Sequence, residues 1–208
     1  MIHPDTKIKF ISDTIGYGVV ATKFIPKGTV TWVQDPLDTV YPPTAVQKLP
    51  PEIREYLNFY SFTNRFGDKV LCWDNGKYVN HSFNPSCFTT PYDFEIAIRD
   101  ISPGEELTDD YGYLNIEKPF VPLNEGTERK TVYPDDLVTY HGQWDNLIRN
   151  CLPYVFTANQ PLLNFIPKQT WETFKTYKDH PALMPSVLES YFNPIKSYEK
   201  HVYQSKHQ

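Results

Sequence analysis

Short apolar runs alternate with polar residues and turns through the first part of the chain. The runs at residues 8–11, 19–22 and 29–33 are rich in β-branched and aromatic residues, which favour strands. A Gly-Tyr-Gly sequence at 16–18 and an Ile-Pro-Lys-Gly sequence at 25–28 separate them, and both are typical of turns. The pattern predicts three strands joined by tight turns.

The middle of the chain predicts a few short elements among loops. Residues 35–50 are rich in proline and are expected to be a loop. Residues 51–60 begin with proline and carry an acidic residue in the first turn, which predicts a helix. Strand signals return at 70–73 and 94–99, with a polar segment at 80–85 between them.

The pattern changes after Gly112. Residues 113–134 contain three prolines and a glycine and predict a loop. From 134 onward the apolar spacing becomes helical, and two further short helices are expected at 169–178 and 185–192. Apolar residues recur at intervals of three or four at Leu137, Tyr140, Trp144, Leu147, Ile148 and Cys151.

Composition and charge narrow the class of protein. The chain has 208 residues, of which 40% are hydrophobic and 22% are charged, as in ordinary globular proteins. A net charge of -5 argues against nonspecific nucleic-acid binding. Three scattered cysteines are too few for a disulfide framework and favour a reducing compartment. No run approaches the length of a membrane span, so a soluble cytoplasmic protein is expected, with its oligomeric state open.

Three separated motifs carry candidate chemistry. The first is Gly-Tyr-Gly at 16–18, the second is Asn-His-Ser-Phe-Asn-Pro at 80–85, and the third is Gly-Glu-Glu-Leu-Thr-Asp-Asp-Tyr at 104–111. Taken singly they have ordinary structural explanations: a tight turn, an Asx- or Ser-capped turn, and an acidic strand after a Pro-Gly turn. Their functional use would be close backbone approach to a ligand and amide or imidazole hydrogen bonds to a polar cofactor. Their joint occurrence in this order favours function.

In this order the motifs resemble the SET family of protein-lysine methyltransferases. The resemblance covers roughly residues 7–113, with a weaker likeness to about 137. It implies an α+β, β-rich and β-clip-like SET fold, in which the second and third motifs meet in a knot-like crossing. It also implies a SET domain at 1–113, a metal-free post-SET-like loop at 114–133 and a helical C-terminal extension at 134–208.

The resemblance also implies a cofactor and a set of site residues. S-adenosylmethionine is expected against Gly16, Tyr17, Gly18, Asn80, His81, Tyr111 and Phe120. Tyr111 is expected to be catalytic, and Asp109 and Tyr111 are expected to line a narrow channel for the substrate lysine. The position of Asp109 is usually Phe or Tyr in the family, which leaves the number of added methyl groups open.

Many family members hold one zinc with four cysteines, and this chain has none of them. Other residues occupy the four positions, and none can supply a thiolate, so no metal is expected. The residues are Phe83, Pro122, Asn124 and Arg129. A replacement site remains an alternative, built from a histidine with Cys72, Cys87 and Cys151.

Strand geometry makes two further predictions. If residues 107–111 are extended, Asp109 and Tyr111 share one face. A buried carboxylate there would favour the lysine ammonium, so an active enzyme is expected to hydrate Asp109 or turn it away. Residues 93–110 hold seven acidic residues and one basic residue, which indicates either a solvated acidic surface or an electronegative approach for a lysine-bearing peptide.

The sequence therefore predicts an enzyme that transfers a methyl group from S-adenosylmethionine to a lysine of a protein or peptide. The alternative is a catalytically degenerate SET module that binds a peptide or partner without turnover. A nucleic-acid methyltransferase is disfavoured by the acidic balance. No membrane partner is expected.

Overall fold

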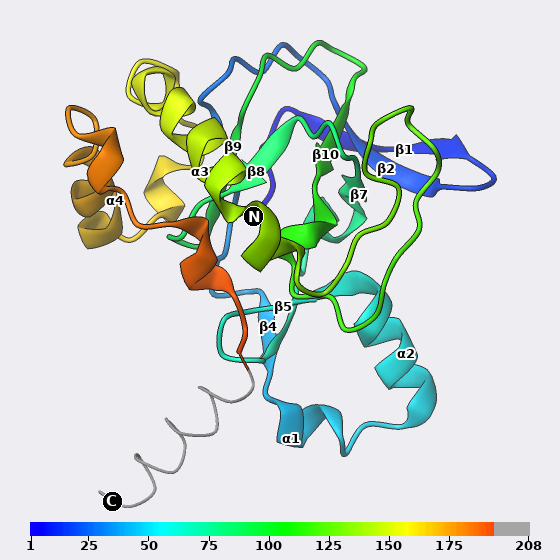
Figure 1. Cartoon of the computed structure of the whole chain (residues 1–208). Coiled ribbons are helices and arrows are strands. Elements are labelled where there is room, and N and C mark those ends of the chain that lie inside the picture. The colour runs from blue at the N-terminus through cyan, green and yellow to red at the C-terminus, as the bar shows by residue number, and fades with distance from the viewer. Residues whose placement is uncertain (194–208) are drawn as a thin grey trace, which may run out of the picture.

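The computed structural model describes residues 1–193, and in it a β-rich body carries helices on two sides (Figure 1). Three small sheets have the strand orders β1-β2-β10-β7, β3-β9-β8 and β4-β6-β5. Their bounds are β1 Thr6–Ser12, β2 Gly16–Ala21, β3 Val30–Val33, β4 Thr39–Tyr41, β5 Ser61–Thr63, β6 Lys69–Leu71, β7 Asn80–His81, β8 Cys87–Thr89, β9 Phe94–Ala97 and β10 Glu106–Asp109.

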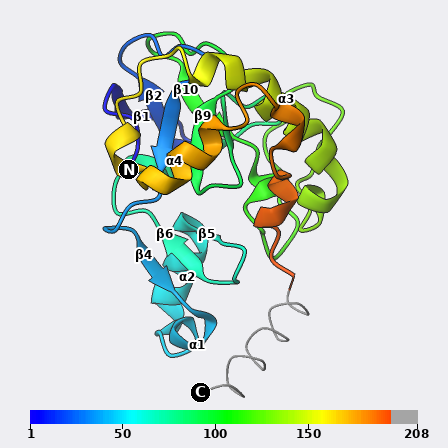
Figure 2. The ribbon, with the colours of Figure 1, turned by 90° about the vertical axis from the view of Figure 1, so that its left-hand side faces the viewer.

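The described helices are mostly short. The α-helices are α1 Pro43–Val46, α2 Pro51–Tyr60, α3 Asp136–Val155 and α4 Lys168–Lys175. The 3-10 turns are η1 Asn75–Tyr78, η2 Tyr111–Tyr113, η3 Leu163–Phe165, η4 Pro181–Leu183 and η5 Val187–Ser190. Figures 1 and 2 show α1 and α2 with the β4-β6-β5 sheet below the other strands, and α3 and α4 beside them.

The four-stranded sheet begins with the β1–β2 hairpin. Gly16 has φ +81°, a conformation that glycine adopts without strain, and it lets the chain turn back. β2 then pairs antiparallel with β10, and β10 pairs parallel with the two-residue strand β7. This order brings together segments that are far apart in the sequence.

Most of the C-terminal helical segment packs into the same core as the strands. α3 buries Leu137, Trp144, Ile148 and Leu152 in one cluster with Phe88 of β8 and with β3 and β9. The three- or four-residue spacing of its apolar side chains directs one face of α3 to this cluster. The segment therefore supports the β3-β9-β8 sheet, which neighbours the four-stranded sheet that carries the three motifs.

Several predicted elements are present and others need correction. The strands near 8–11, 19–22 and 29–33, the helix at 51–60 and the long helix after 134 are found. The expected loop at 35–50 instead contains β4 and α1, and the expected helix at 185–192 is only the 3-10 turn η5. Part of the predicted extension, residues 194–208, lies outside the described residues.

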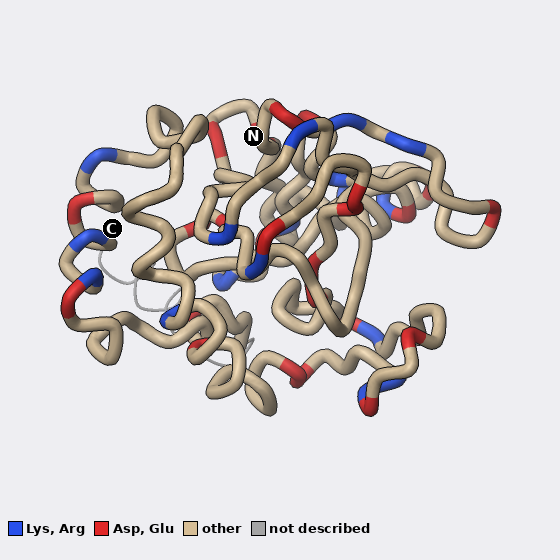
Figure 3. Tube along the Cα trace, turned by 90° about the horizontal axis from the view of Figure 1, so that it is seen from above, with Lys and Arg blue, Asp and Glu red and all other residues tan. Residues whose placement is uncertain are grey.

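Helix apolarity and the distribution of charge concern the membrane and nucleic-acid partners considered above. Within residues 1–193, no helix combines the length and the apolarity that a bilayer span requires. Figure 3 shows basic residues interspersed with acidic residues along the described chain.

Candidate active site

The second and third sequence motifs lie side by side. Asn80 pairs with Thr108, and His81 pairs with Asp109, in the parallel ladder between β7 and β10. The backbone N–H of Ser82 continues the ladder by donating to the carbonyl of Asp109 at 2.9 Å. The backbone that follows β7 is therefore fixed against the end of β10.

Gly18 of the first motif meets the other two at one point. The Asn80 side-chain amide donates to the Glu106 carboxylate at 2.6 Å and to the Tyr17 carbonyl at 3.1 Å. A Cβ atom at Gly18 would lie 2.8 Å from the Asn80 amide nitrogen and closer still to the Glu106 carboxylate. A side chain at this position would displace the ends of the Asn80 and Glu106 side chains, which fill the space where β2, β7 and β10 converge.

The remaining residues of the first motif lie further out. The ring of Tyr17 is 56% exposed and packs edge-to-face on Phe10, with ring centroids 5.6 Å apart. Gly16 sits in the hairpin turn, with open space where a Cβ would be. Tyr17 thus joins the convergence through its carbonyl oxygen, while the structure does not bring Gly16 into it.

His81 has one ring nitrogen engaged and one free. Nδ1 accepts a hydrogen bond from the backbone N–H of Tyr111 at 3.1 Å, which places the ring hydrogen on Nε2. Nε2 is buried and has no hydrogen-bond partner within residues 1–193. Burial, with the nearby Arg129 charge, lowers the pKa of His81 to about 4. The imidazole is therefore neutral at physiological pH and offers a buried donor.

Tyr111 lies between His81 and Phe120. Its ring centroid is 5.3 Å from that of His81 and 5.8 Å from that of Phe120. Its hydroxyl donates to the Val79 carbonyl at 2.8 Å. Burial, together with the neighbouring Asp109 and Glu106, raises the pKa of Tyr111. The phenol stays protonated and is suited to orienting groups, not to taking a proton.

Phe120 reaches this cluster from the loop after η2. A two-way backbone bridge to Val132 holds it, with N···O distances of 3.0 and 2.8 Å. The loop is also tied to the second motif, because the Glu125 carboxylate accepts from the Ser82 hydroxyl at 2.9 Å and from the Phe83 N–H at 3.0 Å. The loop therefore folds over the His81–Tyr111 pair.

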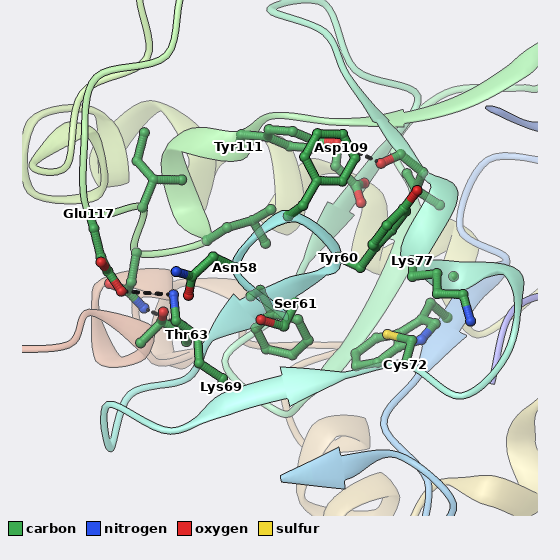
Figure 4. Close-up of a pocket in the computed structure, with 18 of the residues that line it drawn as sticks. Asn58, Tyr60, Ser61, Thr63, Lys69, Cys72, Lys77, Asp109, Tyr111 and Glu117 are labelled. Carbon is green, nitrogen blue, oxygen red and sulfur yellow. Dashed lines mark hydrogen bonds and ion pairs between the residues drawn. The ribbon is translucent and has the colours of Figure 1, made fainter. Parts of the chain in front are cut away.

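A cavity of about 420 Å³ also opens onto Tyr111, and Asp109 lines it with Tyr111 (Figure 4). Its wall includes four further aromatic side chains, and an ion pair between Lys69 and Glu117 at 2.9 Å lies in it. The aromatic residues are Trp32, Phe59, Tyr60 and Phe62. Both residues predicted for a substrate channel thus line one cavity.

The strand argument for Asp109 needs correction. β10 ends at Asp109, and Tyr111 begins the 3-10 turn η2, so strand alternation does not extend to Tyr111. Asp109 is only 5% exposed, and its Oδ1 has no hydrogen-bond partner within the described residues. Burial and the nearby Glu95 raise the pKa of Asp109 well above its ordinary value, which keeps the carboxyl protonated to higher pH. Asp109 therefore faces the cavity and is not turned away from it.

Glu95 is the cavity residue that the sequence motifs do not reveal. It lies in β9, is 9% exposed, and accepts a hydrogen bond from the Tyr113 hydroxyl at 2.9 Å. Burial raises the pKa of Glu95 to about 7. The sequence feature that points to Glu95 is its position inside the otherwise apolar run Phe-Glu-Ile-Ala at 94–97.

The acidic run at 93–110 is not one solvated surface. Glu95, Asp109 and Asp110 are buried. Two others are in ion pairs with arginines, Asp93 with Arg65 and Glu105 with Arg99. A uniform electronegative face is therefore a poor description of this segment.

Arg129 contacts Phe83. Both residues occupy positions at which a zinc-binding cysteine is expected from the family resemblance. The guanidinium carbon lies 4.6 Å from the Phe83 ring centroid. The guanidinium also forms ion pairs with the buried Asp110 and Asp136. Its other ring neighbours are Tyr140 at 4.4 Å and Trp144 at 5.7 Å. An arginine thus joins the loop to β7, η2 and α3 by charge and ring contacts.

The described residues show no alternative metal cluster. Within residues 1–193, no group of three or more His, Cys, Asp or Glu side chains is placed to hold a metal ion. Cys72, Cys87 and Cys151 are each buried and free.

The β-rich fold and the convergence of the three motifs define a SET domain. Residues 16–112 match the model of the SET domain family, and this part of the chain has the SET-domain fold. No curated protein matches it.

Two solved structures are similar to the chain. One is a Plasmodium falciparum protein described as a histone methyltransferase, with 18% identity, a TM-score of 0.39, and coverage of 53% of this chain and 95% of that one. The other is the methyltransferase domain of human histone-lysine N-methyltransferase SETMAR, with 19% identity and a TM-score of 0.44; the match covers 64% of this chain and 58% of the human chain.

Proposed function

We propose that this protein is an S-adenosylmethionine-dependent methyltransferase that acts on a lysine side chain of a protein or peptide. The observation that carries the proposal is the buried Nε2 donor of His81, which has no partner within residues 1–193 and lies where the three motifs meet. Tyr111 contacts the His81 ring and also lines the aromatic cavity, so it connects a polar site with an apolar one.

The residues present fit a polar cofactor. His81 offers a buried neutral donor, and Gly18 lacks a side chain where the three strands converge. Phe120 adds an aromatic edge beside His81 and Tyr111. These residues, with Asn80, would hold S-adenosylmethionine, which supplies a methyl group already activated as a sulfonium.

The cavity would prepare the lysine. Its aromatic wall suits the aliphatic part of a lysine side chain. The amine must be neutral to attack, and deprotonating a lysine with an ordinary pKa at neutral pH costs about 4–5 kcal/mol. Burial disfavours the ammonium and lowers that cost, whereas a carboxylate in the cavity favours the ammonium until it takes up the proton. The protonated Tyr111 hydroxyl would orient the amine without acting as a base.

We also propose a cytoplasmic location. The three cysteines are buried and unpaired, which supports a reducing compartment.

Calorimetry with S-adenosylmethionine tests the cofactor site. Native protein should bind the cofactor, and His81→Ala should weaken binding by about tenfold or more, because a buried donor is lost. His141→Ala is the matched control, since His141 is a half-buried residue of α3 outside the three motifs, and it should bind like the native protein. Absence of binding by the native protein would contradict the proposal. Binding without methyl transfer would instead support the degenerate module.

A further inference from the structure

Two buried carboxyl groups share one tyrosine hydroxyl beside the cavity. Glu95 comes from β9, Asp109 from β10 and Tyr113 from η2, and each is at most 9% exposed. The Tyr113 hydroxyl donates to Glu95 Oε1 at 2.9 Å and also interacts with the Asp109 carboxyl. Asp109 Oδ1 is buried and has no partner within the described residues.

The groups around this pair do not neutralise it. The thiols of Cys72 and Cys87 lie near it, and burial raises the pKa of both thiols, which keeps them uncharged. The phenols of Tyr111 and Tyr113 also stay protonated, since burial raises the pKa of each.

The nearby cationic groups have other partners or lie elsewhere on the wall. The positive charge of the Met1 amino group favours the ionised form of Glu95, but this amino group forms an ion pair with Asp35 at 2.7 Å. Lys69 is ion-paired with Glu117, and the Lys77 ammonium lies 5.7 Å from the Tyr78 ring centroid. Lys118 completes the charged groups on the cavity wall.

The cavity supplies the complementary surroundings for a long cationic side chain. Glu95 and Asp109 both line it, together with the rings of Trp32, Tyr60 and Phe62. An aliphatic chain could lie against these rings while its ammonium donates to the carboxyl oxygens. Buried carboxyl groups are costly without such a donor or a shared proton.

We propose that Glu95 and Asp109 bind the ammonium of the substrate lysine and that Glu95 accepts one of its protons. This inference rests on the proposed function. In the transfer, one N–H bond of the ammonium breaks and one O–H bond forms on the Glu95 carboxylate. The lysine loses its positive charge, Glu95 loses its negative charge, and no electrons are transferred. Tyr113 positions the accepting carboxylate, and Asp109 supplies a further acceptor for the amine.

The burial of the two carboxyl groups agrees with this role, because it favours their protonated forms. A proton acceptor works best when its pKa lies near the working pH, and burial raises the pKa of Glu95 to about 7. Asp109 is held neutral to higher pH by burial and by Glu95. The pair thus carries about one negative charge or less near neutrality, which matches one ammonium.

Binding of n-butylammonium to the purified chain tests the cation site without any turnover. Native protein should bind it near pH 7.5 more tightly than n-butanol, and binding should weaken as the pH falls below about 7. Glu95→Gln should weaken binding by about tenfold or more, because it removes the negative charge, and Asp109→Asn should weaken it by less, because it keeps a neutral carbonyl acceptor. Glu172→Gln, which alters an exposed acid of α4, should bind like the native protein.

Circular dichroism establishes that each variant is folded. If folded Glu95→Gln and Asp109→Asn variants both bind n-butylammonium like the native protein, the cation site is overturned. Methyl transfer by the native protein in that case leaves the proposed function standing, so the two failures are distinguishable.

The pH dependence of methyl transfer to a lysine peptide tests the proton step. Native turnover should fall at low pH with an inflection near pH 7, and Glu95→Gln should lose that inflection while keeping cofactor affinity within a few-fold. The same inflection in Glu95→Gln would overturn Glu95 as the acceptor. Absence of transfer by native protein overturns the proposed function together with this step, whatever n-butylammonium does.

Discussion

Tyr111 connects the two halves of the site through separate parts of its structure. Its backbone N–H donates to His81, its ring contacts His81 and Phe120, and its hydroxyl donates to the Val79 carbonyl. The ring and backbone contacts do not need the hydroxyl. Removing the oxygen alone should therefore leave the polar site in place and affect the orientation of the amine.

We expect Tyr111→Phe to reduce turnover by about 100-fold or more, because without the hydroxyl the lysine amine is no longer held in the orientation for attack on the methyl group. Cofactor affinity should stay within a few-fold, the pattern of an interaction made mainly in the transition state. Tyr133→Phe is the control, because the Tyr133 side chain is half-exposed. Unchanged turnover in Tyr111→Phe, measured by mass spectrometry of a methylated peptide, would refute the catalytic assignment.

At the scale of single residues, the sequence located the polar site better than the cavity. Asn80, His81 and Tyr111 belong to local motifs, and β7 and β10 bring these motifs together. Glu95 has no motif around it, and its role depends on Tyr113 and Asp109, which belong to other elements. Such a cluster exists only in three dimensions, so spacing along the chain could not predict it.

At the scale of elements, Arg129 joins the loop after η2 to the body of the protein. Its two ion-pair partners, Asp110 and Asp136, are almost fully buried, and its guanidinium stacks near Phe83 and Tyr140. Removing one partner of a buried ion pair leaves charges without compensation. The loop that carries Phe120 should therefore depend on this arginine.

We expect Arg129→Ala to lower the free energy of unfolding by about 3 kcal/mol. The free energy of unfolding of Arg129→Lys should lie between those of the native protein and Arg129→Ala, because one ammonium cannot bridge two carboxylates as a guanidinium does. Lys175→Ala, which removes an exposed ion pair with Glu172, should cost about 0.5 kcal/mol or less. Urea denaturation measures all three, and an Arg129→Ala loss no larger than that of Lys175→Ala would contradict this role.

The same loop predicts a protein without stoichiometric zinc. The four expected ligand positions hold Phe83, Pro122, Asn124 and Arg129, and none is a thiolate or imidazole. Elemental analysis of purified protein should find far less than one zinc per chain. One zinc per chain would show that Cys72, Cys87, Cys151 or other residues form a site after all.

The elements that the sequence predicted well are those with strong periodicity. α3 follows from apolar residues at every third or fourth position. The β1–β2 hairpin follows from two apolar runs on either side of a turn, although the turn lies at 13–15 and the Gly-Tyr-Gly residues 16–18, expected to form it, belong to β2. β5 and β8 have only three residues each, too few to show alternation, and were not predicted. Tertiary pairing determines such short strands.

At the scale of the whole molecule, the buried acid pair links stability to pH. In the unfolded chain the Glu95 carboxyl titrates near its ordinary pKa of 4.5, whereas in the folded protein burial raises that pKa to about 7. The folded state therefore holds this proton more tightly. The resulting stabilisation is complete below about pH 4.5 and is lost as the pH rises towards 7.

We therefore expect the melting temperature of Glu95→Gln to rise relative to the native protein as the pH increases from about 5 to about 8. Burial lowers the pKa of His3 and His81, which acts in the opposite direction, and the difference between native and variant removes this common contribution. Scanning calorimetry at several pH values measures the difference. A difference that does not change with pH would contradict the assignment to Glu95.

We propose that the convergence of three motifs beside an aromatic cavity makes this protein a lysine methyltransferase. The most direct test is transfer of a labelled methyl group from S-adenosylmethionine to an array of lysine peptides, each paired with an arginine counterpart. We predict label on lysine peptides alone with native protein, and loss of that label with Tyr111→Phe. Cofactor binding without label on any lysine peptide would contradict the claim and identify the chain as a binding module.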